Sequence, residues 1–118
     1  MAEDRYTSDA NQRRARRKTP REHIAVTDVI TGSTIGRIGN LSRTGLMLIM
    51  PQPLRDNALY QLAFELPNGH GRRARLEIGM SEQWCEAAAM PGQYWAGLHF
   101  VGIGDADDKA LVAWLEAG

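Results

Sequence analysis

Short runs in which apolar and polar residues alternate dominate the chain beyond residue 22. The clearest alternation lies in residues 59–66, where the even-numbered side chains from Tyr60 to Leu66 share one apolar face. Clusters rich in Pro, Gly, Asn and Ser separate these runs, as expected for turns. The pattern predicts six or seven antiparallel strands, within residues 23–31, 34–41, 45–50, 59–66, 72–80, part of 81–88, and 94–101.

The hydrophobic period changes near the C-terminus. Asp105 can act as an N-cap, Asp107 and Asp108 would lie in a first helical turn, and Leu111 and Trp114 then fall on one stripe. These features predict a helix over residues 105–117. Strands followed by one terminal helix indicate an all-β fold, a small antiparallel β-barrel with the helix packed on it.

The formal net charge of the 118 residues is zero, but the charges are unevenly divided. Residues 1–21 hold seven basic and three acidic residues, whereas residues 22–118 hold seven and eleven. Residues 1–20 also lack hydrophobic periodicity, so we expect a flexible basic arm ahead of one barrel domain over residues 21–118. A basic arm on an acidic body suggests an anionic ligand that meets the arm.

Cysteine usage and hydropathy suggest a soluble, cytoplasmic protein. The single cysteine, Cys85, cannot form an internal disulfide. The polar first 22 residues lack the apolar segment of a secretory signal. Pro91 and glycines that include Gly92, Gly97 and Gly102 interrupt the nearly uncharged residues 87–104, which argues against a membrane span.

The residues that usually carry catalysis or bind metals do not form a recognisable arrangement. His23, His70 and His99 lack metal-ligand spacing, and Cys85 has no evident base beside it. No paired carboxylates or nucleophile with a base stand out either. We therefore expect no metal, no cofactor and no enzymatic activity.

Two arginines four residues apart, Arg17 and Arg21, stand just before the first predicted strand, and Arg16 precedes them. Pro20 favours an extended segment, in which the two side chains would point to one side with Cα atoms roughly 13 Å apart. Guanidinium groups bind phosphate bidentately, pair with guanine edges and stack on rings. The segment suits an anion with phosphates and purines, although a solvated basic tail gives the same pattern.

A second group of polar residues occupies the turn between the predicted strands 34–41 and 45–50. Asn40 and Ser42 offer short, stiff hydrogen-bonding groups. Gly45 permits a backbone conformation or a close approach that a Cβ would block. Taken alone, the segment is also typical of an ordinary turn.

Together, an RxxxR motif before the first strand and an (N/D)xSxxG motif about 20 residues later resemble the PilZ domain family. The resemblance covers roughly residues 16–117 and includes a late Gly-x-x-Phe pattern at Gly97 and Phe100. It implies a six-stranded antiparallel PilZ-type β-barrel with a C-terminal helix. It also implies a bacterial receptor for cyclic di-GMP.

The resemblance assigns a role to each matching residue. Arg17 and Arg21 would contact phosphate and guanine, while Asn40, Ser42 and Gly45 would form the opposite lip of the site. Asn40 stands where the family more often has Asp. An amide offers one acceptor oxygen to the guanine N–H donors, whereas a carboxylate offers two, so this residue bears on affinity.

An arginine directly before RxxxR, here Arg16, is associated in this family with an intercalated ligand dimer. The resemblance therefore implies two ligands per chain. Further candidates for ligand contact are Arg13, Arg43, Trp95 and His99.

The leading hypothesis is a cyclic di-GMP receptor or adaptor that orders its arm over the barrel and signals to a separate partner protein. One alternative is a small barrel that binds single-stranded nucleic acid by stacking and electrostatics, against which the acidic body argues. The other is a PilZ-like adaptor that does not bind nucleotide. Competition between labelled cyclic di-GMP and an oligonucleotide separates these hypotheses.

Overall fold

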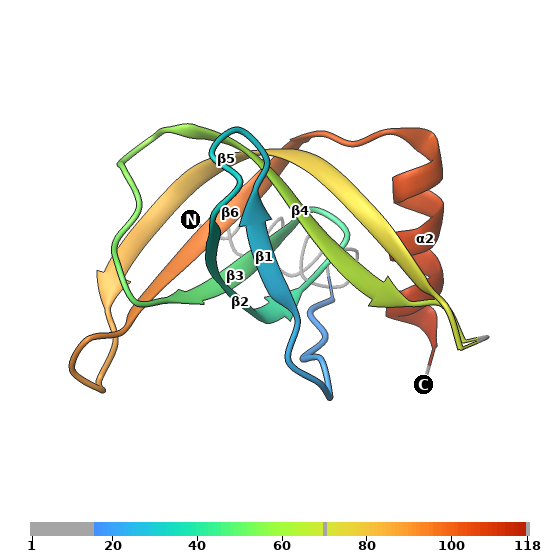
Figure 1. The fold of residues 1–118 in the computed structure, drawn as a ribbon, viewed down its shortest axis with the longest axis horizontal. Coiled ribbons are helices and arrows are strands. Elements are labelled where there is room, and N and C mark those ends of the chain that lie inside the picture. The colour runs from blue at the N-terminus through green and yellow to red at the C-terminus, as the bar shows by residue number, and fades with distance from the viewer. Residues whose placement is uncertain (1–15, 70, 118) are drawn as a thin grey trace, which may run out of the picture.

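A computed structural model describes residues 16–69 and 71–117 of the chain. In the described residues, six antiparallel strands close into a barrel and one helix follows them (Figure 1). The elements are β1 (Ala25–Asp28), β2 (Thr34–Leu41), β3 (Gly45–Met50), β4 (Leu59–Pro67), β5 (Arg73–Ala87), β6 (Tyr94–Gly102) and α2 (Asp105–Glu116).

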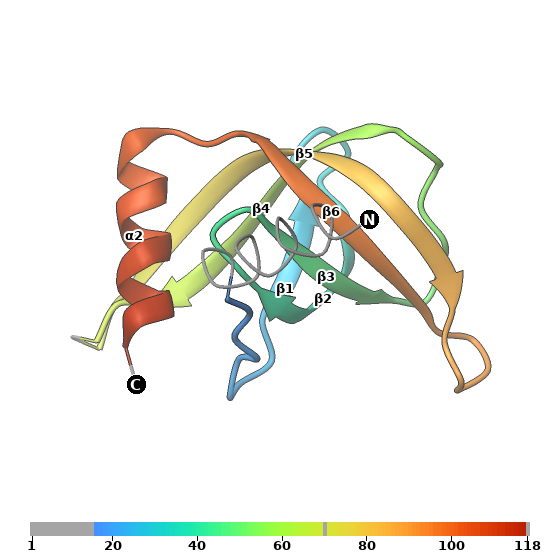
Figure 2. The ribbon, with the colours of Figure 1, turned by 180° about the vertical axis from the view of Figure 1, so that it is seen from behind.

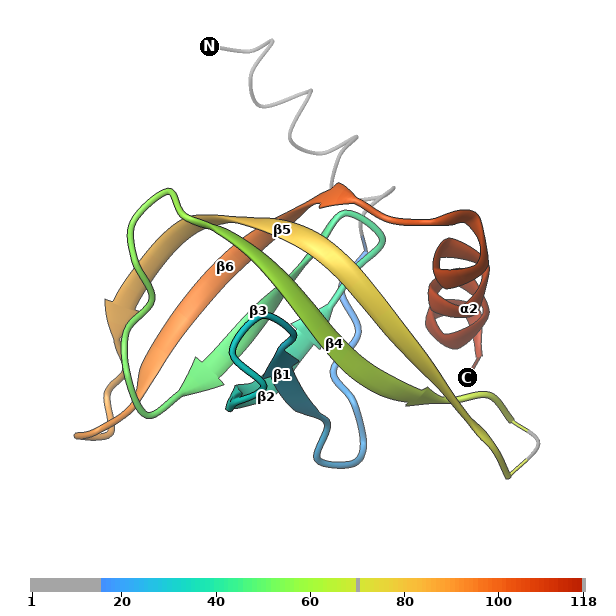
Figure 3. The ribbon, with the colours of Figure 1, turned by 45° about the horizontal axis from the view of Figure 1, so that its top comes forward.

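The strands follow the order β1-β2-β3-β6-β5-β4 around the barrel, and β1 closes it by pairing with β4. This closing seam is short, with Thr27 opposite Ala63 and Asp28 opposite Leu62. The hairpin of β4 and β5 is the longest ladder, and β5 curves across the barrel from the α2 end to the opposite end (Figure 3). Closure leaves each strand paired on both sides over part of its length, which protects its edges.

Alternating side chains build the interior. The even-numbered residues Leu62, Phe64 and Leu66 of β4 are buried, as their period predicted, and Leu76 and Ile78 of β5 meet them from the neighbouring strand. The core continues through β3 and β6 and ends under α2. Burial of this apolar surface is the main force that holds the barrel together.

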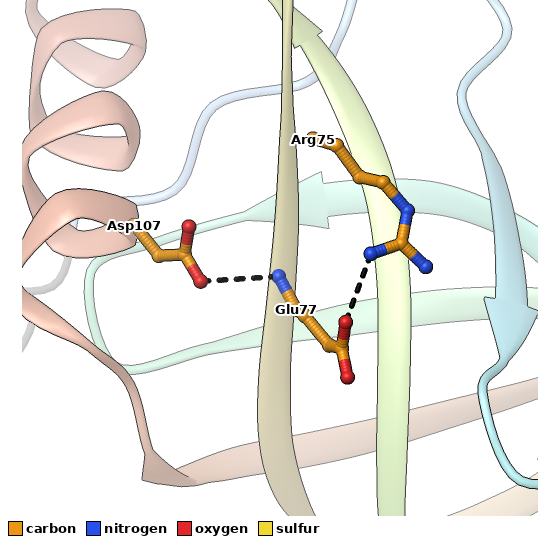
Figure 4. A network of polar contacts seen from close by, with 3 residues as sticks. All are labelled: Arg75, Glu77 and Asp107. Carbon is orange, nitrogen blue, oxygen red and sulfur yellow. Dashed lines mark hydrogen bonds and ion pairs between the residues drawn. The ribbon is translucent and has the colours of Figure 1, made fainter.

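The helix packs against β5 and β4 at one end of the barrel, through the buried residues Leu111 and Trp114. A polar contact fixes its first turn, because the backbone N–H of Glu77 donates to Asp107 Oδ2 at 3.2 Å (Figure 4). Arg75 pairs with the Glu77 carboxylate at 2.8 Å on the same strand. The bond to Asp107 joins the first turn of α2 to the sheet, while the pair of Arg75 and Glu77 lies within β5.

The observed elements match the predicted ones closely, with three differences. The first strand is shorter than residues 23–31, because the chain turns after Asp28. Residues 81–87 are not a separate strand but continue β5, whose register shifts at Gly79/Met80 and at Glu82/Trp84. These irregularities let one strand bend around the barrel.

The third difference concerns the start of the helix. Its N-cap is Gly104, without a side-chain hydrogen bond, so the prediction of Asp105 as N-cap was wrong. Asp105 instead lies in the first turn with Asp107 and Asp108, where the positive end of the helix dipole stabilises negatively charged side chains. No helix in the described part of the chain has the length and apolar character that crossing a membrane requires.

Candidate functional site

The two predicted motifs meet in space. Arg17 Nη1 donates a hydrogen bond to Asn40 Oδ1 at 2.7 Å, across a sequence separation of 23 residues. Arg17 is exposed and Asn40 is half-buried near the end of β2. An accessible guanidinium therefore lies against a side-chain amide, which also contacts Met47 Sδ through its Nδ2 at 3.9 Å.

The backbone next to Arg17 explains why Arg17 and Lys18 lie beside β2. Lys18 N donates to Leu41 O at 2.8 Å, and Leu41 N donates to Lys18 O at 2.9 Å. This antiparallel bridge adds one residue of the arm to the end of β2. Figure 2 shows the segment from residue 16 onward starting below the turn that joins β2 to β3 and running down on the side of the barrel that faces α2.

The Lys18 side chain points to the helix. Its Nζ donates to the carbonyl oxygens of Trp114 and Ala117, both at 2.5 Å, and lies 4.3 Å from the centroid of the Trp114 ring. A cation at a helix C-terminus offsets the negative end of the dipole, and an ammonium over an indole adds a cation–π attraction of about 0.5–2 kcal/mol. Lys18 thus joins the arm, β2 and α2.

Ser42 shapes the turn between β2 and β3. Its hydroxyl accepts hydrogen bonds from the N–H groups of Thr44 and Gly45, both at 3.2 Å, and lies 3.1 Å from Gly45 O, to which it can donate. The residue is fully buried. In this conformation the Ser42 hydroxyl holds the turn between β2 and β3 together.

Gly45 is required by the neighbouring strand. A Cβ at this position would lie 2.3 Å from the carbonyl oxygen of Leu98 on β6. The sequence predicted that Gly45 permits a close approach that a Cβ would block, and in the structure it is the backbone of β6 that approaches. The Phe100 N–H donates to Thr44 O at 2.8 Å and ties the same loop to β6.

Arg21 lies at a bend of the chain, four residues after Arg17. The chain bends at Arg21 and Glu22, and Arg21 lines a cavity of about 550 Å³ with Lys18 and Trp114. Arg17 does not line this cavity. The structure therefore brings Arg17 to the Asn40 lip but directs Arg21 to the space between the arm and the C-terminal end of α2.

The remaining basic candidates differ in their contacts. Arg16 is exposed and makes no hydrogen bond or ion pair with the other described residues. Arg43 forms an ion pair with Asp108 of α2, with Nη2 and Oδ2 3.2 Å apart. This ion pair connects the turn between β2 and β3 to the first turn of α2. Arg13 lies outside the described residues.

The two candidates on β6 lie on the outer face of the barrel. His99 is exposed and stands opposite Gly45 in the register of β3 and β6, which puts it beside the lip. Trp95 pairs with Ile49 at the far end of the same ladder, four residues from His99. His99 is therefore closer to the lip than Trp95.

Among residues 16–69 and 71–117, no three His, Cys, Asp or Glu side chains gather as the ligands of a metal ion would. Cys85 is a half-buried free thiol on β5. The candidate site therefore offers guanidinium, amide and backbone groups, and such groups can bind anions and the polar edges of planar rings.

Sequence reasoning did not identify the contacts of Lys18. Its position inside RxxxR was visible, but its target, the end of α2, lies 96 residues further along the chain. One signal was present: α2 has no basic residue in its last turn, so a cation from elsewhere suits its C-terminus.

A family model for the PilZ domain matches residues 11–117. This match extends over most of the chain, and the chain therefore belongs to the PilZ domain family. The predicted six-stranded barrel with a C-terminal helix is confirmed by its likeness to PilZ structures. No curated protein matches the sequence significantly.

Solved structures resemble this fold at low identity. The Bacillus subtilis inhibitor of motility MotI/DgrA has a TM-score of 0.68 at 15% identity, over 81% of this chain and 45% of that one. The PilZ domain of YcgR from Escherichia coli with c-di-GMP has a TM-score of 0.61 at 15% identity, covering 86% and 87%. YcgR in complex with c-di-GMP gives 0.59 at 16% identity, covering 86% and 43%. The chain thus spans less than half of the MotI/DgrA chain.

Proposed function

We propose that this PilZ domain is a receptor for cyclic di-GMP that binds the ligand between its N-terminal arm and the turn joining β2 to β3. The observation that carries the proposal is the contact between Arg17 and Asn40 at 2.7 Å, which joins the two motifs at an accessible place. Family membership and the c-di-GMP complexes of YcgR support the choice of ligand.

Each proposed contact follows from the chemistry of the ligand, which carries two phosphates and two guanines. The Arg17 guanidinium would bind a phosphate or the O6 and N7 of guanine, and Asn40 Oδ1 would accept from a guanine N–H. Ligand entry would replace the bond between these two side chains. A hydrogen bond that involves a charged group is worth about 1.5–3 kcal/mol, and the charge-assisted bonds to the ligand would offset its loss.

The other motif residues would act in different ways. Arg21 would turn from its cavity toward the ligand, since no hydrogen bond or ion pair to another described residue holds its side chain. Ser42 and Gly45 would keep the lip in shape. We propose that Arg43 and His99 border the ligand and that Trp95 is a more distant candidate. Arg13, which lies outside the described residues, remains a candidate for ligand contact.

We further propose that two cyclic di-GMP molecules bind as an intercalated pair. Arg16 supports this stoichiometry because it is exposed next to Arg17 and adds a second guanidinium for the outer molecule. Binding would order the arm over the barrel, and the altered surface would be read by a separate partner protein. The ordering entropy is offset by several charge-assisted hydrogen bonds.

Isothermal titration with cyclic di-GMP tests the proposal in the full chain. We expect two ligands per protein, and an affinity about 10- to 100-fold weaker in Arg17→Ala because charge-assisted hydrogen bonds are lost. Arg55→Ala is the matched control, since Arg55 is an exposed arginine that neither lines the arm's cavity nor forms an ion pair with another described residue. Its affinity should stay unchanged.

Three results would contradict the proposal in different ways. No binding by the unmodified protein would leave an adaptor that does not use the nucleotide. Displacement of labelled cyclic di-GMP by excess single-stranded oligonucleotide would favour the nucleic-acid alternative. One ligand per chain at saturation would remove the intercalated pair and leave the receptor intact.

A further inference from the structure

Lys18 occupies a position that connects three parts of the molecule. Its backbone is hydrogen-bonded in both directions to Leu41, the residue between Asn40 and Ser42 of the lip. Its ammonium donates to Trp114 O and Ala117 O at the end of α2. One residue therefore determines where the arm crosses both the lip and the helix.

The chemistry of the helix end explains why the side chain stays there. The last carbonyl oxygens of a helix have no partner within the helix. The last turn of α2 contains no basic residue of its own. The ammonium of Lys18 supplies a cation at this end and donates to Trp114 O, which also accepts from the Ala117 N–H at 3.3 Å, and to Ala117 O. The Trp114 ring covers the ammonium from one side at 4.3 Å.

Neighbouring side chains of an extended segment point in opposite directions, so the placement of Lys18 decides the placement of Arg17. With the Lys18 side chain held at α2, Arg17 is turned to the other side, where it reaches Asn40 at 2.7 Å. Lys18 thus attaches this segment to α2, while Arg17 points its guanidinium toward Asn40.

Building on the proposed function, we propose that Lys18 is a positioning residue for the ligand site. It holds Arg17 at the lip by its attachment to α2, and it couples occupation of the site to the order of the last turn of α2. Because this attachment consists of contacts within the chain itself, it lowers the ordering cost that the ligand would otherwise bear. Because coupling is reciprocal, the bound ligand stabilises the end of α2 in return.

The other end of the helix strengthens the geometric argument. Arg43, inside the lip, pairs with Asp108 in the first turn of α2 at 3.2 Å. Each of the two motifs thus carries one basic residue that contacts α2. The pair at Arg43 is exposed and is worth little by itself, so Lys18 carries the coupling.

The test compares Lys18→Met with Lys109→Met in the full chain. Lys109 is an exposed lysine of α2 with no hydrogen bond or ion pair to another described residue, so both variants lose one positive charge. Hydrogen exchange without ligand should accelerate in residues 38–42 and 111–117 of Lys18→Met only. Titration should show cyclic di-GMP affinity about 5- to 20-fold weaker in Lys18→Met than in Lys109→Met.

Two further measurements separate positioning from a loss of stability. Lys18→Arg keeps the cation and should recover most of the affinity. Cyclic di-GMP should slow exchange at residues 111–117 in the unmodified protein and in Lys109→Met, but not in Lys18→Met. If the methionine variant does not fold, Lys18→Gln carries the same comparison with a polar side chain.

The inference is overturned if Lys18→Met and Lys109→Met exchange at the same rates and bind with the same affinity. Failure of the proposed function gives a different result, because the unmodified protein then does not bind cyclic di-GMP. In that case hydrogen exchange without ligand still tests whether Lys18 attaches the arm to α2. Unchanged rates at residues 38–42 and 111–117 of Lys18→Met refute this attachment, and faster rates at both segments support it.

Discussion

At the scale of single residues, Gly45 and Ser42 show that residues of a proposed binding motif can also stabilise the turn that contains them. The Ser42 hydroxyl satisfies two backbone N–H groups, and Gly45 lets the Leu98 carbonyl of β6 approach. Both residues were predicted as ligand contacts, and that assignment stays a prediction. Their contacts within the fold add a reason for these residue types.

Gly45→Ala should lower the free energy of unfolding by about 1–3 kcal/mol, because the new Cβ would meet Leu98 O at 2.3 Å and force the strands apart. Denaturant unfolding followed by circular dichroism measures the change. Gly102→Ala is the control, since nothing lies within 4 Å of a Cβ built there. Equal stability of Gly45→Ala and the unmodified protein would show that β3 and β6 can separate without cost.

At the scale of elements, the sequence pattern predicted what depends on local alternation. The strands at 34–41 and 45–50 have the predicted bounds, because turn residues separate two regular runs. The full length of β5 was not predicted, because polar residues after Met80 interrupt the alternation and Glu82 is nonetheless buried. A register shift beside Glu82 lets the strand continue, and such a shift depends on partner strands.

The attachment of α2 gives a prediction at the same scale. Asp107→Ala removes the acceptor for the Glu77 N–H and should cost about 1–2 kcal/mol of stability. Asp105→Ala removes an exposed carboxylate from the same helical turn and serves as the control for the dipole effect. Denaturant titration of both variants isolates the contact shown in Figure 4, and the account is contradicted if Asp105→Ala is equally destabilised.

At the scale of the whole molecule, the fold brings together segments that the sequence could only place near one another. The pairing of the two motifs predicted that Arg17 and Asn40 belong to one site. Their hydrogen bond puts the two side chains in contact, and their shared role in binding a ligand stays a prediction. The separation of Arg21 from Arg17 was not predictable, because residues 67 and 69 and the C-terminal end of α2, which line the cavity beside Arg21, lie far from it in the sequence. The attachment of Lys18 to the helix end has the same origin.

The surface that results has the arm on one side, the lip on the other and α2 in contact with both. In the proposed receptor, cyclic di-GMP would lie against the arm and the lip, and the helix would carry the change to another face of the barrel. A separate partner protein would then sense the end of α2 or the ordered arm.

A crystal structure of the protein grown with saturating cyclic di-GMP tests the central claim most directly. The account predicts ligand density between the arm and the turn of residues 40–45, with the Arg17 guanidinium on a phosphate or guanine and Asn40 facing a guanine edge. Ligand bound on another face, or a crystal in which Arg17 still bonds to Asn40 and the lip stays empty, would contradict it.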